Sequence, residues 1–256
     1  MLLAIDIGNT EVTVGLFDDA VLAGHWRFMT TPDRTPDEWA QVLGQALIAA
    51  PRPIVSCVLG SVAPGATSAV AQGVEKVTGV AAMRIDAKSA LPLVLDVDHP
   101  ESVGADRIIN GLVAQLEWRA AAIIVDFGTA TTFDCVTADG RFIGGAIMPG
   151  LRTSADELTR KAAKLPATDL QLPQRAIGRN TEACIQAGVL FGAADAIDGM
   201  VRRIRAEWPE PVRPRAIATG GLSVLVAPLC RELDGVDRDL TLRGLRLAAV
   251  HLRLAH

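Results

Sequence analysis

The chain opens with Leu2-Leu3-Ala4-Ile5-Asp6-Ile7-Gly8-Asn9-Thr10, and a similar stretch, Ala122-Ile123-Ile124-Val125-Asp126-Phe127-Gly128-Thr129-Ala130-Thr131, begins 120 residues later. In each stretch a short apolar run, typical of a buried strand, ends at an Asp-x-Gly turn. A second strand candidate follows each turn, Val12 to Phe17 and Thr132 to Thr137. Turn residues and a third strand candidate come next in both copies. The nearly equal spacing indicates a duplicated unit.

Helix and strand patterns alternate through the rest of each half. The expected helices are residues 36–49, 64–77, 102–118 and 181–207, with two more that start at Leu222 and Leu242. The expected strands are residues 53–59 and 215–218. Strands in succession followed by alternating helices and strands predict a mixed sheet flanked by helices, an α/β fold. The second copy starts just after Arg119, so we expect one domain over residues 1–118 and another over residues 119–256.

Composition limits the function classes. The 256 residues are half apolar and carry a net charge of −4, which argues against a nucleic-acid partner because such proteins need a concentrated basic surface. The apolar runs Met1 to Ile5 and Ala120 to Val125 are too short for a signal peptide or a membrane span. We therefore expect a cytoplasmic protein without a membrane partner. The four cysteines lie far apart and include no Cys-x-x-Cys pair, which argues against zinc.

The two Asp-x-Gly turns suit phosphate chemistry. A glycine turn lets backbone N–H groups approach phosphates, and small polar side chains such as Asn9, Thr10 and Thr129 add donors. An Asp at a strand end can hold a cation, because hard cations prefer oxygen ligands. A single Asp-x-Gly is more often a plain turn, but two copies in matching contexts favour a nucleotide site. P-loop and dinucleotide-binding motifs are absent from the sequence, and the four histidines lie near no nucleophile motif.

Two facing phosphate loops resemble the duplicated ribonuclease H-like domains of the actin, sugar kinase and Hsp70 type, which bind nucleotide in a cleft between them. Further motifs make the chain similar to one family, the type III pantothenate kinases, over essentially its whole length. These motifs, in order, are Asp6-x-Gly8-Asn9-Thr10, residues 100–107 (Pro-Glu-Ser-Val-Gly-Ala-Asp-Arg), residues 126–132, residues 144–150, residues 177–181 and residues 218–222. The pairing of Gly-Ala-Asp-Arg with Asp-x-Gly-Thr-Ala-Thr-Thr is the specific part of the resemblance.

The resemblance implies a role for each matching position. The first ATP phosphate loop would consist of Asp6, Ile7, Gly8, Asn9, Thr10, Glu11, Val12 and Thr13. Thr129 would contact ATP from the second loop, and Asp6 would help to hold Mg²⁺ through the nucleotide. Asp126 would bind a monovalent cation, K⁺ or NH₄⁺.

The substrate site follows from the same resemblance. It would include Gly104, Ala105, Asp106 and Arg107, with Asp106 as the catalytic base and the fork of Arg107 suited to a carboxylate. Thr181 would contact the substrate from the neighbouring subunit of a homodimer. Gly220-Gly221 resembles the turn on the adenosine side of the nucleotide in the wider superfamily.

The implied activity is the ATP-dependent phosphorylation of pantothenate to 4′-phosphopantothenate, the first step of coenzyme A biosynthesis. One alternative is a kinase for another small hydroxyl compound on the same fold. A second alternative is a non-catalytic nucleotide-binding regulator, which we would expect to have lost Asp106 or one of the loops. The sequence departs from the family pattern at Glu11, which adds a negative charge beside the phosphates, and at Val97 and His99.

Overall fold

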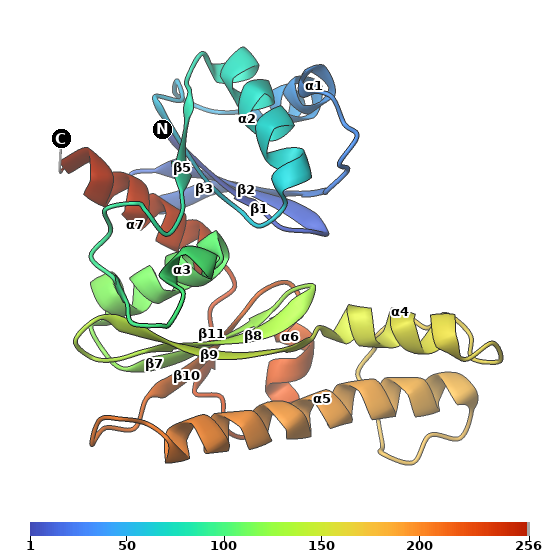
Figure 1. The fold of residues 1–256 in the computed structure, drawn as a ribbon. Helices are drawn as coiled ribbons and strands as arrows, with labels where there is room; N and C mark the ends of the chain where they lie inside the picture. The colour runs from blue at the N-terminus through green and yellow to red at the C-terminus, as the bar shows by residue number, and fades with distance from the viewer. Residues whose placement is uncertain (255–256) are drawn as a thin grey trace. The chain divides into compact units, whose positions relative to one another are not determined.

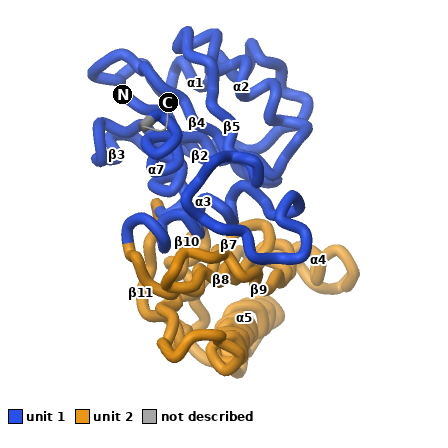
Figure 2. The backbone as a smooth tube through the Cα atoms, turned by 60° about the vertical axis from the view of Figure 1, so that its left-hand side comes forward, with its two compact units in different colours: residues 1–117, 240–256 blue, residues 118–239 orange. Residues whose placement is uncertain are grey.

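The computed structural model describes residues 1–254. The chain divides into two compact units, shown in different colours in Figure 2. The first unit holds residues 1–117 together with the segment from Leu240 onward, and the second unit holds Trp118–Asp239. We expected residues 119–256 to form the second domain. The last helix instead belongs to the first unit, because its apolar face packs on that unit's sheet and helices.

The first unit is built on a five-stranded sheet in the order β3-β2-β1-β4-β5, in which β1 pairs antiparallel with β2 and parallel with β4. Its elements are β1 (Leu2–Ile7), β2 (Glu11–Asp18), β3 (Val21–Met29), α1 (Pro36–Leu47), β4 (Ser56–Ser61), α2 (Pro64–Thr78), β5 (Ala82–Ile85), β6 (Val94–Leu95), a 3₁₀ turn (Pro100–Ser102), α3 (Ala105–Val113), a π-helical turn (Ala114–Trp118) and α7 (Leu240–Leu254).

Helices cover both faces of this sheet (Figure 1). On one face Ile5 and Ile7 pack with Trp39 of α1 and Val70 of α2 in a buried apolar core. On the other face α3 and α7 pack against each other and against β4. The alternation of side chains along a strand therefore sends Asp6, which lies between Ile5 and Ile7, to the α3 and α7 face.

The second unit repeats this plan. In its sheet β7 pairs antiparallel with β8 and parallel with β10, and β8 pairs with β9. Its elements are β7 (Ala122–Phe127), β8 (Ala130–Val136), β9 (Arg141–Pro149), α4 (Leu151–Lys161), α5 (Thr181–Ala206), β10 (Arg215–Thr219), α6 (Ser223–Val226), a 3₁₀ turn (Ala227–Leu229) and β11 (Gly235–Val236).

One face of the second sheet packs against the long helix α5. Val125 and Phe127 of β7 and Ala218 of β10 join Leu190 and Ile197 of α5 in a second apolar core. Asp126 lies between Val125 and Phe127, so its side chain is directed to the opposite face of the sheet. The two halves thus place Asp6 and Asp126 at equivalent positions of equivalent strands.

The structure confirms the predicted strand units and most of the predicted helices. Asp19 has a positive φ of 53° in the first turn between strands two and three, and Gly140 has a φ of 85° in the second. The predicted helix at residues 102–118 is shorter, because α3 begins at Ala105 and passes into a π-helical turn at Ala114. Helix α4 was not predicted.

Helix α5 has the length and apolar composition of a membrane span, with a mean hydropathy of 1.3 over its most apolar 18 residues. The core helix of a soluble protein passes the same test, and one such helix is weak evidence for a membrane. Leu190, Ala194, Ile197 and Val201 are buried against the sheet, so the core explains part of the apolar character of α5.

Candidate active site

The first Asp-x-Gly loop is a tight connection between β1 and β2. Ile7 pairs with Val12, which leaves residues 8–11 in the loop. The N–H of Gly8 donates to the carbonyl of Glu11 at 2.9 Å. Thr30 anchors the loop from β3's end: its hydroxyl donates to the carbonyl of Gly8 at 2.7 Å, and its N–H donates to the carbonyl of Thr10 at 2.8 Å. The two hydrogen bonds from Thr30 therefore fix the conformation of the loop, while residues 9–11 are exposed to solvent.

Glu11 is the position where this loop departs from the family pattern. Its carboxylate lies 3.8 Å from the guanidinium of Arg27 on β3, and about half of the Glu11 side chain is exposed. An exposed ion pair of this kind contributes little to stability. Arg27 nevertheless offsets the charge that Glu11 adds beside the loop.

Asp6 stands in a row of small residues across the first sheet. It pairs with Thr13 on β2 and with Gly60 on β4, so these three residues face the same side. A side chain at Gly60 would collide with Ile109 of α3, at 2.5 Å from the position of a Cβ, and would touch Ala105 at 3.6 Å. Glycine at this position thus lets the start of α3 lie against the strand beside Asp6.

The segment Gly104 to Arg107 is brought to the same strand end by a second contact. Val62 follows β4, and its N–H donates to the carbonyl of Ile7 at 3.0 Å. The side chain of Val62 lies 3.3 Å from the position that a Cβ on Gly104 would take. The predicted phosphate loop and the predicted substrate segment therefore come together within the first unit, although almost 100 positions separate them in the sequence.

Asp106 lies in the first turn of α3, after the N-cap residue Gly104. Its Oδ1 accepts a hydrogen bond of 2.8 Å from the N–H of Arg107. Burial raises the pKa of the Asp106 carboxyl, while the N–H and the charge of Arg107 act in the opposite direction. A carboxylate with a raised pKa holds a proton more readily than an exposed one, which suits a general base.

Helix α7 packs against α3 and fixes its position. The two helices cross at Gly244, where a Cβ would meet the carbonyl oxygen of Ile109 and lie 2.6 Å from the Cγ2 of Ile109. The hydroxyl of Thr241 donates to the buried amide of Asn110 at 2.8 Å. Asn110 follows Asp106 by one helical turn, so this contact holds the helix that carries Asp106.

The second loop is shorter than the first. Phe127 pairs with Thr131, which leaves residues 128–130, one residue fewer than the four of the first loop. The N–H of Gly128 donates to the carbonyl of Ala130 at 3.0 Å. The carbonyl of Thr129 accepts from the N–H of Gly150 at 3.1 Å and from the hydroxyl of Thr153 at 2.7 Å. The unpredicted helix α4 thus begins against this loop, and the Thr129 residue is exposed.

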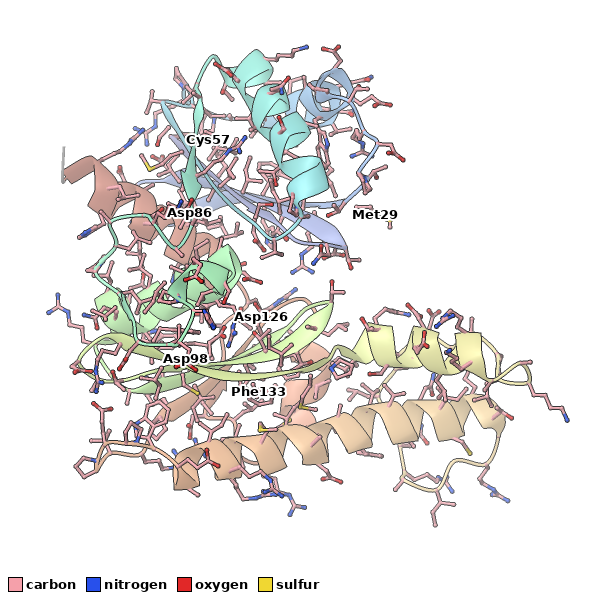
Figure 3. The ribbon with its side chains drawn as sticks, in the orientation of Figure 1. Met29, Cys57, Asp86, Asp98, Asp126 and Phe133 are labelled. Atoms are coloured by element: carbon pink, nitrogen blue, oxygen red, sulfur yellow. The ribbon has the colours of Figure 1, made fainter. Side chains whose placement is uncertain are left out.

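Asp126 stands at the end of β7, opposite the core face of the second sheet (Figure 3). It pairs with Thr132 on β8 and with Thr219 on β10. Gly220 follows Thr219 with a φ of 88°, and a Cβ on Gly220 would lie 2.5 Å from Oδ1 of Asp126. A glycine is required here both by its backbone conformation and by the approach of the carboxylate. Thr219 was not predicted as a site residue.

Thr181 is the first residue of α5, after the N-cap Asn180, whose side chain accepts a 2.8 Å hydrogen bond from the N–H of Ala183. It lines a cavity of about 580 Å³ between α4, α5 and the sheet. Thr131 lines the same cavity, and because Thr131 neighbours Thr132 on β8, it faces the opposite side from Asp126. The cavity that Thr181 lines thus lies on one face of the second sheet, and Asp126 is directed to the other face.

The sequence matches the family model for type III pantothenate kinases over residues 2–203. A type III pantothenate kinase of Thermomicrobium roseum is 44% identical over 251 residues, which is 97% of this chain and 96% of the relative. That extent of similarity decides the family. The chain belongs to the type III pantothenate kinases. Family members of Anaeromyxobacter sp. and Syntrophotalea carbinolica are 42% and 40% identical over 252 residues, with 96% of this chain covered and 98% and 97% of theirs.

Solved structures with low sequence identity establish the fold of this family member. An activator of 2-hydroxyisocaproyl-CoA dehydratase from Clostridium difficile, solved with ADPNP, has a TM-score of 0.57 at 13% identity, with 99% of this chain and 96% of that chain covered. A ROK family glucokinase from Streptomyces griseus has a TM-score of 0.50 at 13% identity, with 99% of both chains covered. The fold is therefore that of the actin and sugar kinase type, as the duplicated loops predicted.

Proposed function

We propose that this protein transfers the γ-phosphoryl group of ATP to the hydroxyl group of pantothenate, giving 4′-phosphopantothenate in the first step of coenzyme A biosynthesis. The observation that carries the proposal is the family membership over nearly the whole chain. The geometry supports it, because the first unit brings the Asp6 loop and the Asp106 turn of α3 to the same strand end.

In the proposed mechanism, the exposed tip of the first loop receives the phosphates of ATP. Asn9 and Thr10 lie at this tip, and Thr30 keeps the loop in one shape. Preorganised donors reduce the reorganisation that the reaction would otherwise need. Thr129 is exposed on the second loop and is fixed through its carbonyl to α4, which suits a contact to the same nucleotide.

Asp106 acts as the general base. The pantothenate hydroxyl oxygen attacks the γ-phosphorus, a new oxygen–phosphorus bond forms, and the bond to the bridging oxygen of ADP breaks. The proton of the hydroxyl passes to the Asp106 carboxylate, whose pKa is raised by burial. Arg107 follows Asp106 on α3 and provides a cation for the carboxylate of pantothenate.

Two carboxylates suit the cations that the family implies. Mg²⁺ and a monovalent cation, when bound, offset the negative charge of the phosphates. Asp6 faces the α3 side at the end of β1, and its carboxylate would supply an oxygen ligand for Mg²⁺ bound with ATP. Asp126 suits a monovalent cation, because its carboxylate stands at the end of β7 between the hydroxyl-bearing residues Thr132 and Thr219.

We infer a homodimer in which Thr181 completes the pantothenate site of the partner subunit. Thr181 lines a cavity on the core side of the second sheet, whereas Asp126 faces the other side. The resemblance to the family implies that Thr181 makes this contact from the neighbouring subunit. Apolar and small residues of α5 line the same cavity, among them Val189, Gly192 and Ala193, and such a surface suits a subunit interface. The proposed place of action is the cytoplasm.

The proposal is tested by measuring ADP release with purified protein, ATP, Mg²⁺ and pantothenate, in K⁺ or in Na⁺ at equal ionic strength. We expect ADP release to require pantothenate and to be faster in K⁺. Asp106→Asn should lower turnover roughly 10²–10⁴-fold, the usual contribution of a general base. Asp98→Asn is the matched control, since Asp98 is an exposed carboxylate of the preceding segment, and it should keep full activity.

The assay also separates the competing functions. Turnover with another small alcohol but not with pantothenate would indicate a different kinase on this fold. ATP binding without turnover of any alcohol would indicate a nucleotide-binding regulator. Either result contradicts the proposed function.

A further inference from the structure

Thr219, at the end of β10, carries an unexplained polar group. Its side chain is fully buried, with 0% exposure, and its hydroxyl oxygen has no hydrogen-bond partner. A buried polar group without a partner lowers the stability of the fold, so such a group is rare and calls for a ligand or an ordered water. The position, beside a predicted cation ligand, favours a ligand.

Sheet register places this hydroxyl beside Asp126. Thr219 pairs with Asp126 on the neighbouring parallel strand, and Asp126 pairs with Thr132 on the other side. Directly paired residues face the same side of a sheet. Three oxygen-bearing side chains therefore form one row, on the side opposite the apolar core that contains Val125 and Ala218.

The neighbours of the row pack closely against it and fix the positions of its side chains. Gly220 has no side chain where a Cβ would lie 2.5 Å from Oδ1 of Asp126. The hydroxyl of Ser223 donates to the carbonyl of Gly220 at 2.7 Å and fixes this turn. On the far side of the row, Thr132 makes a long hydrogen bond of 3.4 Å to the buried Asp134, which orients the Thr132 hydroxyl.

The first sheet has a glycine at the position that corresponds to Thr219. There Asp6 pairs with Thr13 and Gly60, so Gly60 corresponds to Thr219. At Gly60 a Cβ would collide with Ile109 of α3, so packed helix atoms fill the space. The two duplicated sheets thus differ at this position of the row. The first sheet has Gly60, and the second has Thr219 with its unpartnered hydroxyl.

We propose that the Thr219 hydroxyl is a direct ligand of the cation held by Asp126. This inference rests on the proposed cation site and adds a ligand to it. The Asp126 carboxylate and the neutral hydroxyl oxygen of Thr219 would hold this ion together, and K⁺ is the probe for it. Oxygen donors are the ligands that hard cations prefer.

The test measures cation binding through thermal unfolding, without turnover. The melting temperature is recorded with and without ADP while K⁺ replaces choline at constant ionic strength. A cation that binds the folded state raises the melting temperature by mass action. We expect K⁺ to stabilise the native chain and Thr219→Ser, whereas Thr219→Val should need at least about tenfold more K⁺ for the same rise, since even outer-shell partners change metal affinity 10–100-fold.

Thr168→Val is the matched control. Thr168 is also a buried threonine of the second unit, but its hydroxyl donates to the carbonyl of Pro166 at 3.1 Å. Its removal should lower stability equally at all K⁺ concentrations. If Thr219→Val behaves in the same way, the hydroxyl meets a buried water rather than a cation and the proposal fails. It also fails if K⁺ does not stabilise the native chain. Because no substrate is turned over, a K⁺ effect that depends on Thr219 would stand even if pantothenate were not phosphorylated.

Discussion

At the scale of single residues, burial of the Asp106 carboxyl suits a general base but makes its ionised form destabilising. Its carboxyl has a raised pKa because burial disfavours the ionised form more than Arg107 favours it. The folded state therefore binds a proton at this group more tightly than the unfolded state does. Its contribution to stability is fully present below the unfolded pKa and is lost as the pH rises through the raised folded pKa.

We predict that Asp106→Asn melts at a higher temperature than the native protein at neutral pH, because the neutral amide escapes the desolvation that raises the pKa of the native carboxyl. The difference should shrink as the pH falls below the folded pKa of Asp106. Thermal unfolding of both proteins between neutral and acid pH checks this. A neutral-pH melting temperature of Asp106→Asn below that of the native protein would contradict the raised pKa.

The charge of Arg107 gives a second prediction at the residue scale. Arg107 lowers the pKa of Asp106, so Arg107→Gln should raise that pKa further. The acid limb of the pH profile of kcat/KM, which reports the base of the free enzyme, should then move to higher pH. The KM for pantothenate should also rise. Arg84→Gln, at an exposed position of β5, should leave the profile unchanged; an unmoved limb in Arg107→Gln would contradict the role of this charge.

At the scale of elements, α3 is positioned by α7. Close contact at Gly244 and the Thr241 to Asn110 hydrogen bond join the two helices behind Asp106. A helix that carries a general base must be held to within a fraction of an ångström, since small displacements reduce the rate strongly. Stability and turnover are thus expected to depend together on this helix crossing.

Gly244→Ala should destabilise the protein by about 1–3 kcal/mol, the usual range for overpacking, because the new methyl group meets backbone atoms of Ile109. Turnover should fall as α3 shifts. Gly44→Ala is the matched control, since Gly44 is also helical but its Cβ would have ordinary contacts of 3.8 Å. That variant should be neutral or more stable by up to about 1 kcal/mol. Chemical denaturation and kcat are measured for both variants. Equal stability and equal turnover of the two variants would contradict the role of the α3 and α7 contact at Gly244.

Sequence reasoning was most successful where a local pattern carries the structure. The strands around Asp6 and Asp126 were predictable because each apolar run ends at a glycine turn. Helix α4 was not predicted, since its exposed polar residues give little apolar periodicity and only Leu151 and Ala155 are buried. The unit to which α7 belongs depends on tertiary packing that no local pattern contains.

Among the site residues, the motifs named Asp106 and Asp126 but could not reveal their surroundings. The raised pKa of Asp106 comes from its burial in the folded chain, which a local sequence pattern does not contain. Thr219 was missed because its significance lies in its register with Asp126 on β10. The signal that could have found it is the internal repeat, aligned strand by strand.

At the scale of the whole molecule, the proposed dimer predicts complementation. If Asp106 of one chain and Thr181 of the other form each pantothenate site, a mixed dimer of Asp106→Asn and Thr181→Ala chains contains one intact site and one doubly altered site. Random exchange of equal amounts should restore about a quarter of native activity. Subunit exchange followed by the ADP-release assay measures this. Activity no higher than the mean of the two variants alone would show that both residues act within one chain.

The return of α7 to the first unit has a consequence for synthesis on the ribosome. Residues 1–117 leave the exit tunnel first, but the sheet face that α3 and α7 share lacks α7 until the segment from Leu240 has been translated. The second unit is one continuous stretch, Trp118–Asp239, and all of it has been translated before the first unit is whole. The first unit is therefore the first to enter translation but the last to have all of its residues available for folding. A stop codon near the end of the gene would damage the sheet that was made first.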